Sequence, residues 1–89
     1  MDTKRQNLAL SIVGLAQGAI TVGTENADPL IRGHLHTMVE HGHILTEQKD
    51  EIISAWEVLR EDIDYPKPRG VTEVSLKNLI SRLQSLHAA

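Results

Sequence analysis

The sequence predicts an all-α protein, a compact bundle of about four helices with an aliphatic core. Four segments carry apolar residues three and four positions apart, which is the spacing of one helix face, and none shows the alternation of a strand. Only 2% of the residues are aromatic, Trp56 and Tyr65, with no Phe. Small β-domains usually depend on aromatic cross-strand pairs, so an aliphatic helix bundle fits this composition better. The 89 residues are expected to form a single domain, 1–89.

The first predicted helix covers residues 3–22. Its apolar residues form two adjacent rows, Leu8, Ile12, Leu15, Ala19 and Val22 beside Ala9, Val13, Ala16 and Ile20. Two adjacent rows make a wide apolar face, so we expect this helix to be the most buried. Gly23 and the polar residues 24–26 should end it.

The second predicted helix covers residues 29–41. Asp28 is expected to be its N-cap, with Pro29 at the first helical position, because both residue types favour those places. Gly42 should end this helix in the left-handed conformation.

The third predicted helix covers residues 47–63, with Thr46 as its N-cap, and the fourth covers 73–87, opened by Thr72 or Ser75. Their apolar faces are Ile52, Ile53, Trp56, Leu59 and Ile63 in the third, and Leu76, Leu79, Ile80, Leu83 and Leu86 in the fourth. Pro66 and Pro68 force extended geometry on the residues before them, which predicts an extended connector at 64–71.

The formal charge of −3 argues against non-specific binding to nucleic acid or to anionic membranes. The absence of cysteine excludes disulfides and thiol catalysis, and it fits a cytoplasmic protein. Lys4 and Arg5 before the apolar run superficially resemble a signal peptide. Gln17 and Glu25 interrupt that pattern, and the run is too short to span a bilayer. We therefore expect a cytoplasmic protein that contacts no membrane.

Four of the five histidines lie within ten residues, at His34, His36, His41 and His43. Since each helical residue advances about 100°, His34 and His41 share one flank of the second helix but lie two turns apart, roughly 10 Å. Two ligands of one metal ion cannot easily be so far apart, because metal–nitrogen bonds are near 2.1 Å. His36 and Glu40 face solvent together. A weak metal site made by His36, Glu40 and His43 is one alternative, and a pH-sensitive helix end that contacts a partner is the other.

Small or polar residues form a row on the first helix, Asn7, Ser11, Gly14, Gly18 and Thr21. A mid-helix glycine costs about 1 kcal/mol relative to alanine. Gly14 and Gly18 therefore suggest that another backbone approaches closely, from a second helix of this chain or from a symmetric partner. The alternative is that the two glycines are merely tolerated.

Trp56 is either a core anchor or an interface hot spot, since it is the only large aromatic on a predicted helix. The segment Tyr65–Arg69, with Lys67, is either a plain connector or a stiff arm that docks on a partner with little loss of entropy.

No catalytic pattern is present. The serines lie on predicted helices or at caps, outside any nucleophile elbow, and the carboxylates Glu57, Glu61, Asp62 and Asp64 resemble a solvated acidic rim. The second and third helices around Gly42 could imitate a helix-turn-helix. Its recognition segment would nevertheless present Glu47, Asp50 and Glu51 to phosphates, which is electrostatically unfavourable.

These observations predict a non-enzymatic protein-interaction module without cofactors, acting as a regulator, inhibitor or assembly factor on a larger protein and forming a homodimer. The predicted contact residues are Gly14, Gly18, His36, Glu40, Trp56, Tyr65, Lys67 and Arg69. Two alternatives are kept. One is a nucleic-acid-binding regulator that uses Lys4, Arg5, Lys67, Arg69, Lys77 and Arg82. The other is a weak metal-binding protein that uses the His34–His43 cluster.

Overall fold

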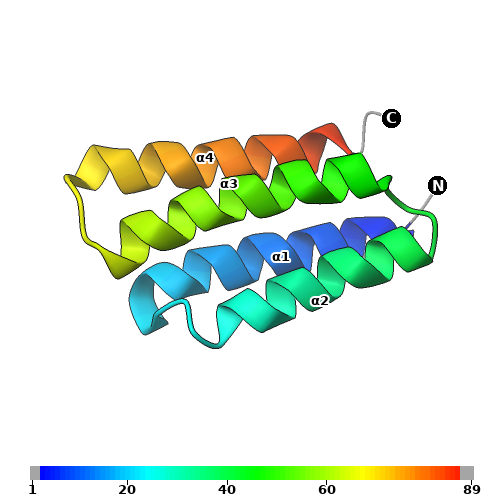
Figure 1. The fold of residues 1–89 in the computed structure, drawn as a ribbon, viewed down its shortest axis with the longest axis horizontal. Coiled ribbons are helices and arrows are strands. Elements are labelled where there is room, and N and C mark those ends of the chain that lie inside the picture. The colour runs from blue at the N-terminus through cyan, green and yellow to red at the C-terminus, as the bar shows by residue number, and fades with distance from the viewer. Residues whose placement is uncertain (1–2, 87–89) are drawn as a thin grey trace.

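A computed structural model describes residues 3–86, apart from the side chain of Arg69, and the prediction of an all-α four-helix bundle is confirmed. The helices are α1 (Thr3–Val22), α2 (Ala27–Glu40), α3 (Thr46–Asp64) and α4 (Arg69–Ser85). They run antiparallel as two hairpins, α1 with α2 and α3 with α4, packed side by side (Figure 1). One end of the bundle holds loops 23–26 and 65–68, which we call the two-loop end. The opposite end holds loop 41–45.

The core is aliphatic around one aromatic residue, as the composition predicts. Its largest fully buried side chains are Ile12, Ile31, Leu35, Met38, Ile52, Trp56, Leu59, Leu79 and Leu83. All four helices contribute to this single cluster. None of the described helices is long and apolar enough to cross a membrane.

The prediction that the first helix is the most buried is wrong. Its buried residues are Ala9, Ile12, Ala16 and Ala19, two from each predicted row. Ile20 is 44% exposed and Val22 is 83% exposed. The reason is that α1 occupies a corner of the bundle, packed mainly against α2 and α4, so only the strip where the two rows meet is buried. Gly23 ends α1 at φ +99°, as predicted, and its N–H bonds to the carbonyl of Ala19 at 2.8 Å.

The start of α2 differs from the prediction and its end agrees with it. Asn26 is the N-cap, so Asp28 lies inside the first turn and its side chain is free to bind elsewhere. At the other end Gly42 has φ +74°. The N–H groups of Gly42 and His43 bond to the carbonyls of Val39 and Met38, at 3.0 and 2.8 Å. This pair of bonds is a Schellman motif, in which glycine avoids the strain of the left-handed conformation.

Both remaining helices begin earlier than predicted. Leu45, not Thr46, is the N-cap of α3, where Gln48 Oε1 accepts the Leu45 N–H at 2.8 Å. Helix α4 begins at Arg69 directly after Pro68, so the extended segment is 65–68 and not 64–71. A proline restricts the residue before it, and this leaves the residue after it free to be helical. The predicted end of the fourth helix at residue 87 lies outside the described residues.

Candidate functional site

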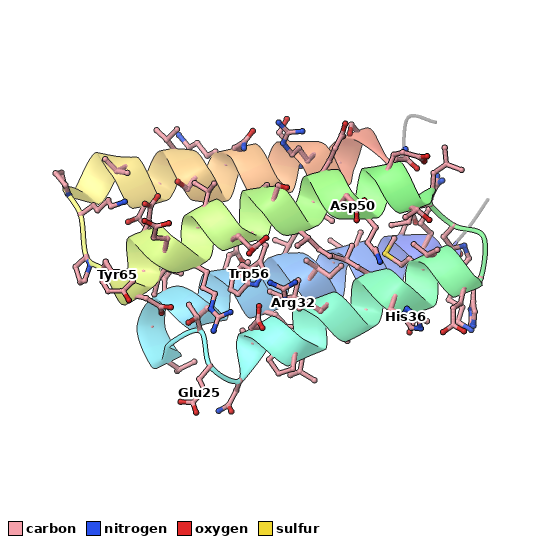
Figure 2. All side chains as sticks on the ribbon, in the orientation of Figure 1. Glu25, Arg32, His36, Asp50, Trp56 and Tyr65 are labelled. Carbon is pink, nitrogen blue, oxygen red and sulfur yellow. The ribbon has the colours of Figure 1, made fainter. Side chains whose placement is uncertain are left out.

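Asp28 is the centre of a polar seam between α2 and α3. Its Oδ1 accepts hydrogen bonds from Trp56 Nε1 at 2.8 Å and Arg32 Nε at 3.0 Å, and Arg60 Nη1 lies at 3.2 Å. Figure 2 shows Arg32 and Trp56 side by side between these helices. Burial alone would raise the pKa of Asp28. The hydrogen bonds from Trp56 and Arg32 and the charges of Arg32 and Arg60 together outweigh burial, so the pKa is lowered.

The seam extends to the two-loop end of the bundle. Arg60 Nε lies 3.6 Å from Asp64 Oδ2, and Thr24 Oγ1 donates to Asp64 Oδ1 at 2.6 Å. Nearer the middle, Arg32 Nη2 lies 3.7 Å from Glu57 Oε2. These contacts join the loop of one hairpin to the end of the other. The polar contacts of the seam therefore hold the two hairpins together.

Asp62 is a buried carboxylate between α3 and α4. It is 4% exposed, accepts a hydrogen bond from Ser75 Oγ at 2.5 Å and pairs with Lys67 Nζ at 3.1 Å. The hydrogen bonds from Ser75 and Lys67, with the charge of Lys67, lower the pKa of Asp62 against the opposing effect of burial. The prediction of a solvated acidic rim is wrong for this residue. Its spacing of three and seven residues from Leu59 and Ala55 places it on the core face, and that signal was available in the sequence.

The histidine cluster does not gather its rings at one point. His36 lies on the outer side of α2 (Figure 2), and its Nε2 is 2.9 Å from Oε1 of Glu40, which is also exposed. The rings of His41 and His43 meet edge to face with centroids 5.9 Å apart, around the Gly42 cap. Among residues 3–86, no group of three or more His, Cys, Asp or Glu side chains could hold a metal ion.

Trp56 cannot serve as a partner contact in this structure. Its side chain is 0% exposed, enclosed by the core and hydrogen-bonded to Asp28. The interpretation as an interface residue is therefore wrong, and Trp56 is the core anchor.

The Tyr65–Arg69 arm is shorter and more firmly held than predicted. Tyr65 is 71% exposed, but the Lys67 ammonium is paired with Asp62 and Arg69 already belongs to α4. The Arg69 side chain lies outside the described part of the structure. Arg82, another cation of the nucleic-acid alternative, is paired with Glu51 at 3.8 Å. Ion pairing thus occupies two of the cations that a nucleic-acid surface would use.

Comparison with protein-family models, curated proteins and solved structures finds no match. The surface itself therefore supplies the argument about function.

The row of small residues on α1 is exposed, from Asn7 through Gly14 and Gly18 to Thr21. A Cβ added at Gly14 or Gly18 would meet no atom of residues 3–86 within 4 Å. The prediction that another helix of this chain approaches closely here is therefore wrong, whereas the symmetric partner stays a prediction. We call the exposed side of α1 the α1 face. Residues 6–24 contain no charged side chain, and Leu10 is 66% exposed beside the row.

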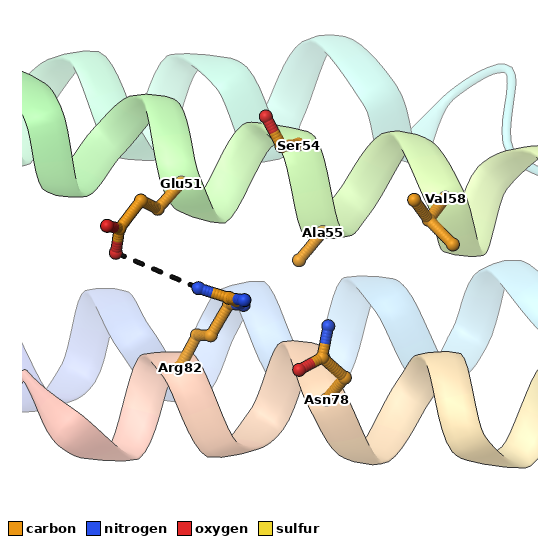
Figure 3. A pocket seen from close by; sticks show the side chains of 6 residues that line it. All are labelled: Glu51, Ser54, Ala55, Val58, Asn78 and Arg82. Atoms are coloured by element: carbon orange, nitrogen blue, oxygen red, sulfur yellow. Dashed lines mark ion pairs between the residues drawn. The ribbon is translucent and has the colours of Figure 1, made fainter.

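A shallow groove of about 370 Å³ runs between α3 and α4 (Figure 3). Its lining is Glu51, Ser54, Ala55, Val58, Asn78 and Arg82. A second hollow of about 420 Å³ is lined by Pro68, Gly70, Val71, Val74 and Ser75. Val74 of the second hollow and Asn78 of the first are one turn apart on α4, so the two hollows are neighbours along this helix. We call the two hollows together the α3–α4 groove.

Proposed function

We propose that this chain is a non-enzymatic protein-interaction module, a regulator, inhibitor or assembly factor that binds a larger protein and that pairs with a second copy of itself through the α1 face. The observation that carries the proposal is an exposed, uncharged helix face with two glycines that the chain's own packing does not require.

The free energy of the two glycines favours an external partner. Each mid-helix glycine costs about 1 kcal/mol relative to alanine. Within residues 3–86, open space surrounds both positions, so no contact in this chain offsets that cost. A partner helix that approached closely over Gly14 and Gly18 would offset it by packing backbone against backbone.

The absence of charge favours a second copy as that partner. A two-fold interface brings the same patch of both subunits together, so a patch with charge of one sign would repel its own copy. The α1 face carries none from residue 6 to residue 24. The 20 residues of α1 span about 30 Å, and the exposed Leu10 and Val22 add apolar area to its flanks.

Sedimentation velocity over a concentration range of about 5–500 µM tests this proposal, because a weak dimer dissociates within such a range. We expect the wild-type mass to rise toward that of a dimer. Gly14→Leu and Gly18→Leu should stay monomeric. Gly33→Leu is the matched control, because Gly33 is also exposed, helical and open to a Cβ, but lies on α2. A monomer mass at every wild-type concentration, or equal effects of all three variants, would contradict the proposal.

A further inference from the structure

The α3–α4 groove has an apolar floor that remains uncovered within the described chain. Val58 is 54% exposed and Val74 is 67% exposed, and Ala55 lies between them and the polar end of the groove. The Glu51–Arg82 ion pair closes one end, Ser54 comes next to it along α3, and Asn78 lies across from Ala55 (Figure 3). The groove therefore offers a short apolar strip with hydrogen-bonding groups beside it and an ion pair at one end.

Carboxylates follow the side of α3 that lies between this groove and the α2–α3 seam. They lie three and four residues apart on its outward side, at Glu47, Asp50, Glu57, Glu61 and Asp64, and Ser54 completes the series. We call this series the acidic ridge. Ser54 also lines the groove, so ridge and groove are adjacent. In all, α3 carries seven acidic and two basic residues.

The acidic ridge is only partly neutralised by the chain itself. Glu57 lies 3.7 Å from Arg32 and Asp64 lies 3.6 Å from Arg60. Glu47, Asp50 and Glu61 form no ion pair with any residue that the structure describes. Like charges one turn apart destabilise a helix, and a cationic partner would remove that repulsion.

We infer that the α3–α4 groove binds an amphipathic helix of the protein partner, with a narrow apolar stripe that packs on Val58 and Val74 and with Lys or Arg residues that pair with the acidic ridge. The inference rests on the proposed function, since it assigns the second surface of the same module. Charge complementarity selects the occupant, because a strip flanked on one side by carboxylates favours a helix with cations on that side. The α4 residues that line the two hollows run from Gly70 to Arg82, a wall of about 18 Å, enough for about three turns.

The test is calorimetric titration of the full chain with a synthetic peptide of about 18 residues, long enough to form a helix in a groove. The peptide has one Leu/Val/Ala stripe at helical spacing and Lys or Arg on one flank. A second peptide replaces each Lys and Arg by Glu, and a third keeps the composition but scrambles the stripe. We expect binding of the first peptide alone, weakened several-fold when salt is raised from about 50 to about 300 mM.

Two chain variants locate the site. Val58→Asp and Val74→Asp should each weaken binding of the basic peptide by about tenfold, because each places an unpaired carboxylate on the apolar floor. Both side chains are exposed, so the fold should persist, as far-UV circular dichroism can verify. Leu30→Asp on α2, 50% exposed, is the matched control and should leave binding unchanged.

Equal binding of the basic and acidic peptides, or unchanged binding by Val58→Asp and Val74→Asp, would overturn the inference. If a second copy of this chain occupies the groove instead, Val58→Asp will lower the mass seen in sedimentation, and that result would also overturn it. Loss of dimerisation in Gly14→Leu, with peptide binding intact, would separate the two surfaces. These outcomes therefore distinguish a wrong inference about the groove from a wrong proposed function.

Discussion

The two ends of the bundle differ in how their polar residues are used. At the two-loop end, Thr24, Asp28 and Asp64 are bound to groups far away in the sequence, including Trp56 and Arg60. At the end with loop 41–45, His36 and Glu40 are close in sequence and bind each other in solvent. Polar residues that lie close together in the sequence therefore do not form the tightest polar cluster. That cluster is made by residues far apart in the sequence, which helix packing brings together.

The largest effect should come from the residue that joins the seam to the core. Trp56→Ala removes a fully buried indole and its bond to Asp28, and should lower the free energy of unfolding by about 3–5 kcal/mol. Trp56→Phe keeps most of the packing and should cost clearly less. Urea denaturation followed by circular dichroism measures both. Similar losses for the two variants would mean that the hydrogen bond outweighs the packing.

Asp28→Asn tests the seam itself. The substitution keeps the shape but removes the charge that faces Arg32 and Arg60, and should cost about 1–3 kcal/mol. Urea denaturation at neutral pH measures this loss. Glu25→Gln, at an exposed residue of the two-loop end, is the control. Its free energy of unfolding should be within about 0.5 kcal/mol of wild type, the usual range for a surface substitution. An unchanged free energy of unfolding in Asp28→Asn would show that the seam contributes no stability.

The pH dependence of stability follows from Asp28 and Asp62. The pKa values of Asp28 and Asp62 are lowered in the folded state, so both carboxylates bind protons less readily there than in the unfolded chain. Stability should be constant above about pH 5 and fall as the pH drops through about 3.9 toward the lowered folded pKa values. Thermal unfolding measured at a series of pH values across this range checks the expected fall in stability. Asp28→Asn should show a shallower fall, because only Asp62 still contributes to it.

The smallest effect is expected at the opposite end. His36→Ala and His41→Ala remove exposed side chains, and the His36–Glu40 pair is worth at most about 0.5 kcal/mol. Each variant should therefore unfold within about 0.5 kcal/mol of wild type. A loss near that of Asp28→Asn would erase the contrast between the two ends.

The helical period of the sequence was sufficient to predict the bundle and its core. The apolar spacing located all four helices, and Gly23 and Gly42 correctly located two helix ends because positive φ strongly favours glycine. The starts were less predictable: Asn26, Leu45 and Pro68 are the observed N-caps, and none of them makes a side-chain capping bond. Backbone hydrogen bonds and the Gln48 side chain stabilise these helix starts, and N-cap residue preferences do not predict such contacts.

The polar clusters could be predicted only in part. Asp62 lies on the core face by spacing alone, so its burial was readable from the sequence. Asp28 was not, because its partners Trp56 and Arg60 lie 28 and 32 residues away and meet it only after the hairpins pack. The open space at Gly14 likewise depends on which corner of the bundle α1 occupies.

The most direct test of self-pairing through the α1 face uses the absence of native cysteine, which lets one introduced thiol report alone. Ser11→Cys, Gly14→Cys and Gly18→Cys would be compared with Gly33→Cys during mild oxidation. A two-fold helix pair brings equivalent residues near its axis within the Cα separation of about 4.4–6.8 Å that a disulfide requires. Self-pairing through the α1 face predicts rapid formation of disulfide-linked dimer at one or two adjacent α1 positions and little at Gly33→Cys. Equal rates at all four positions would contradict it.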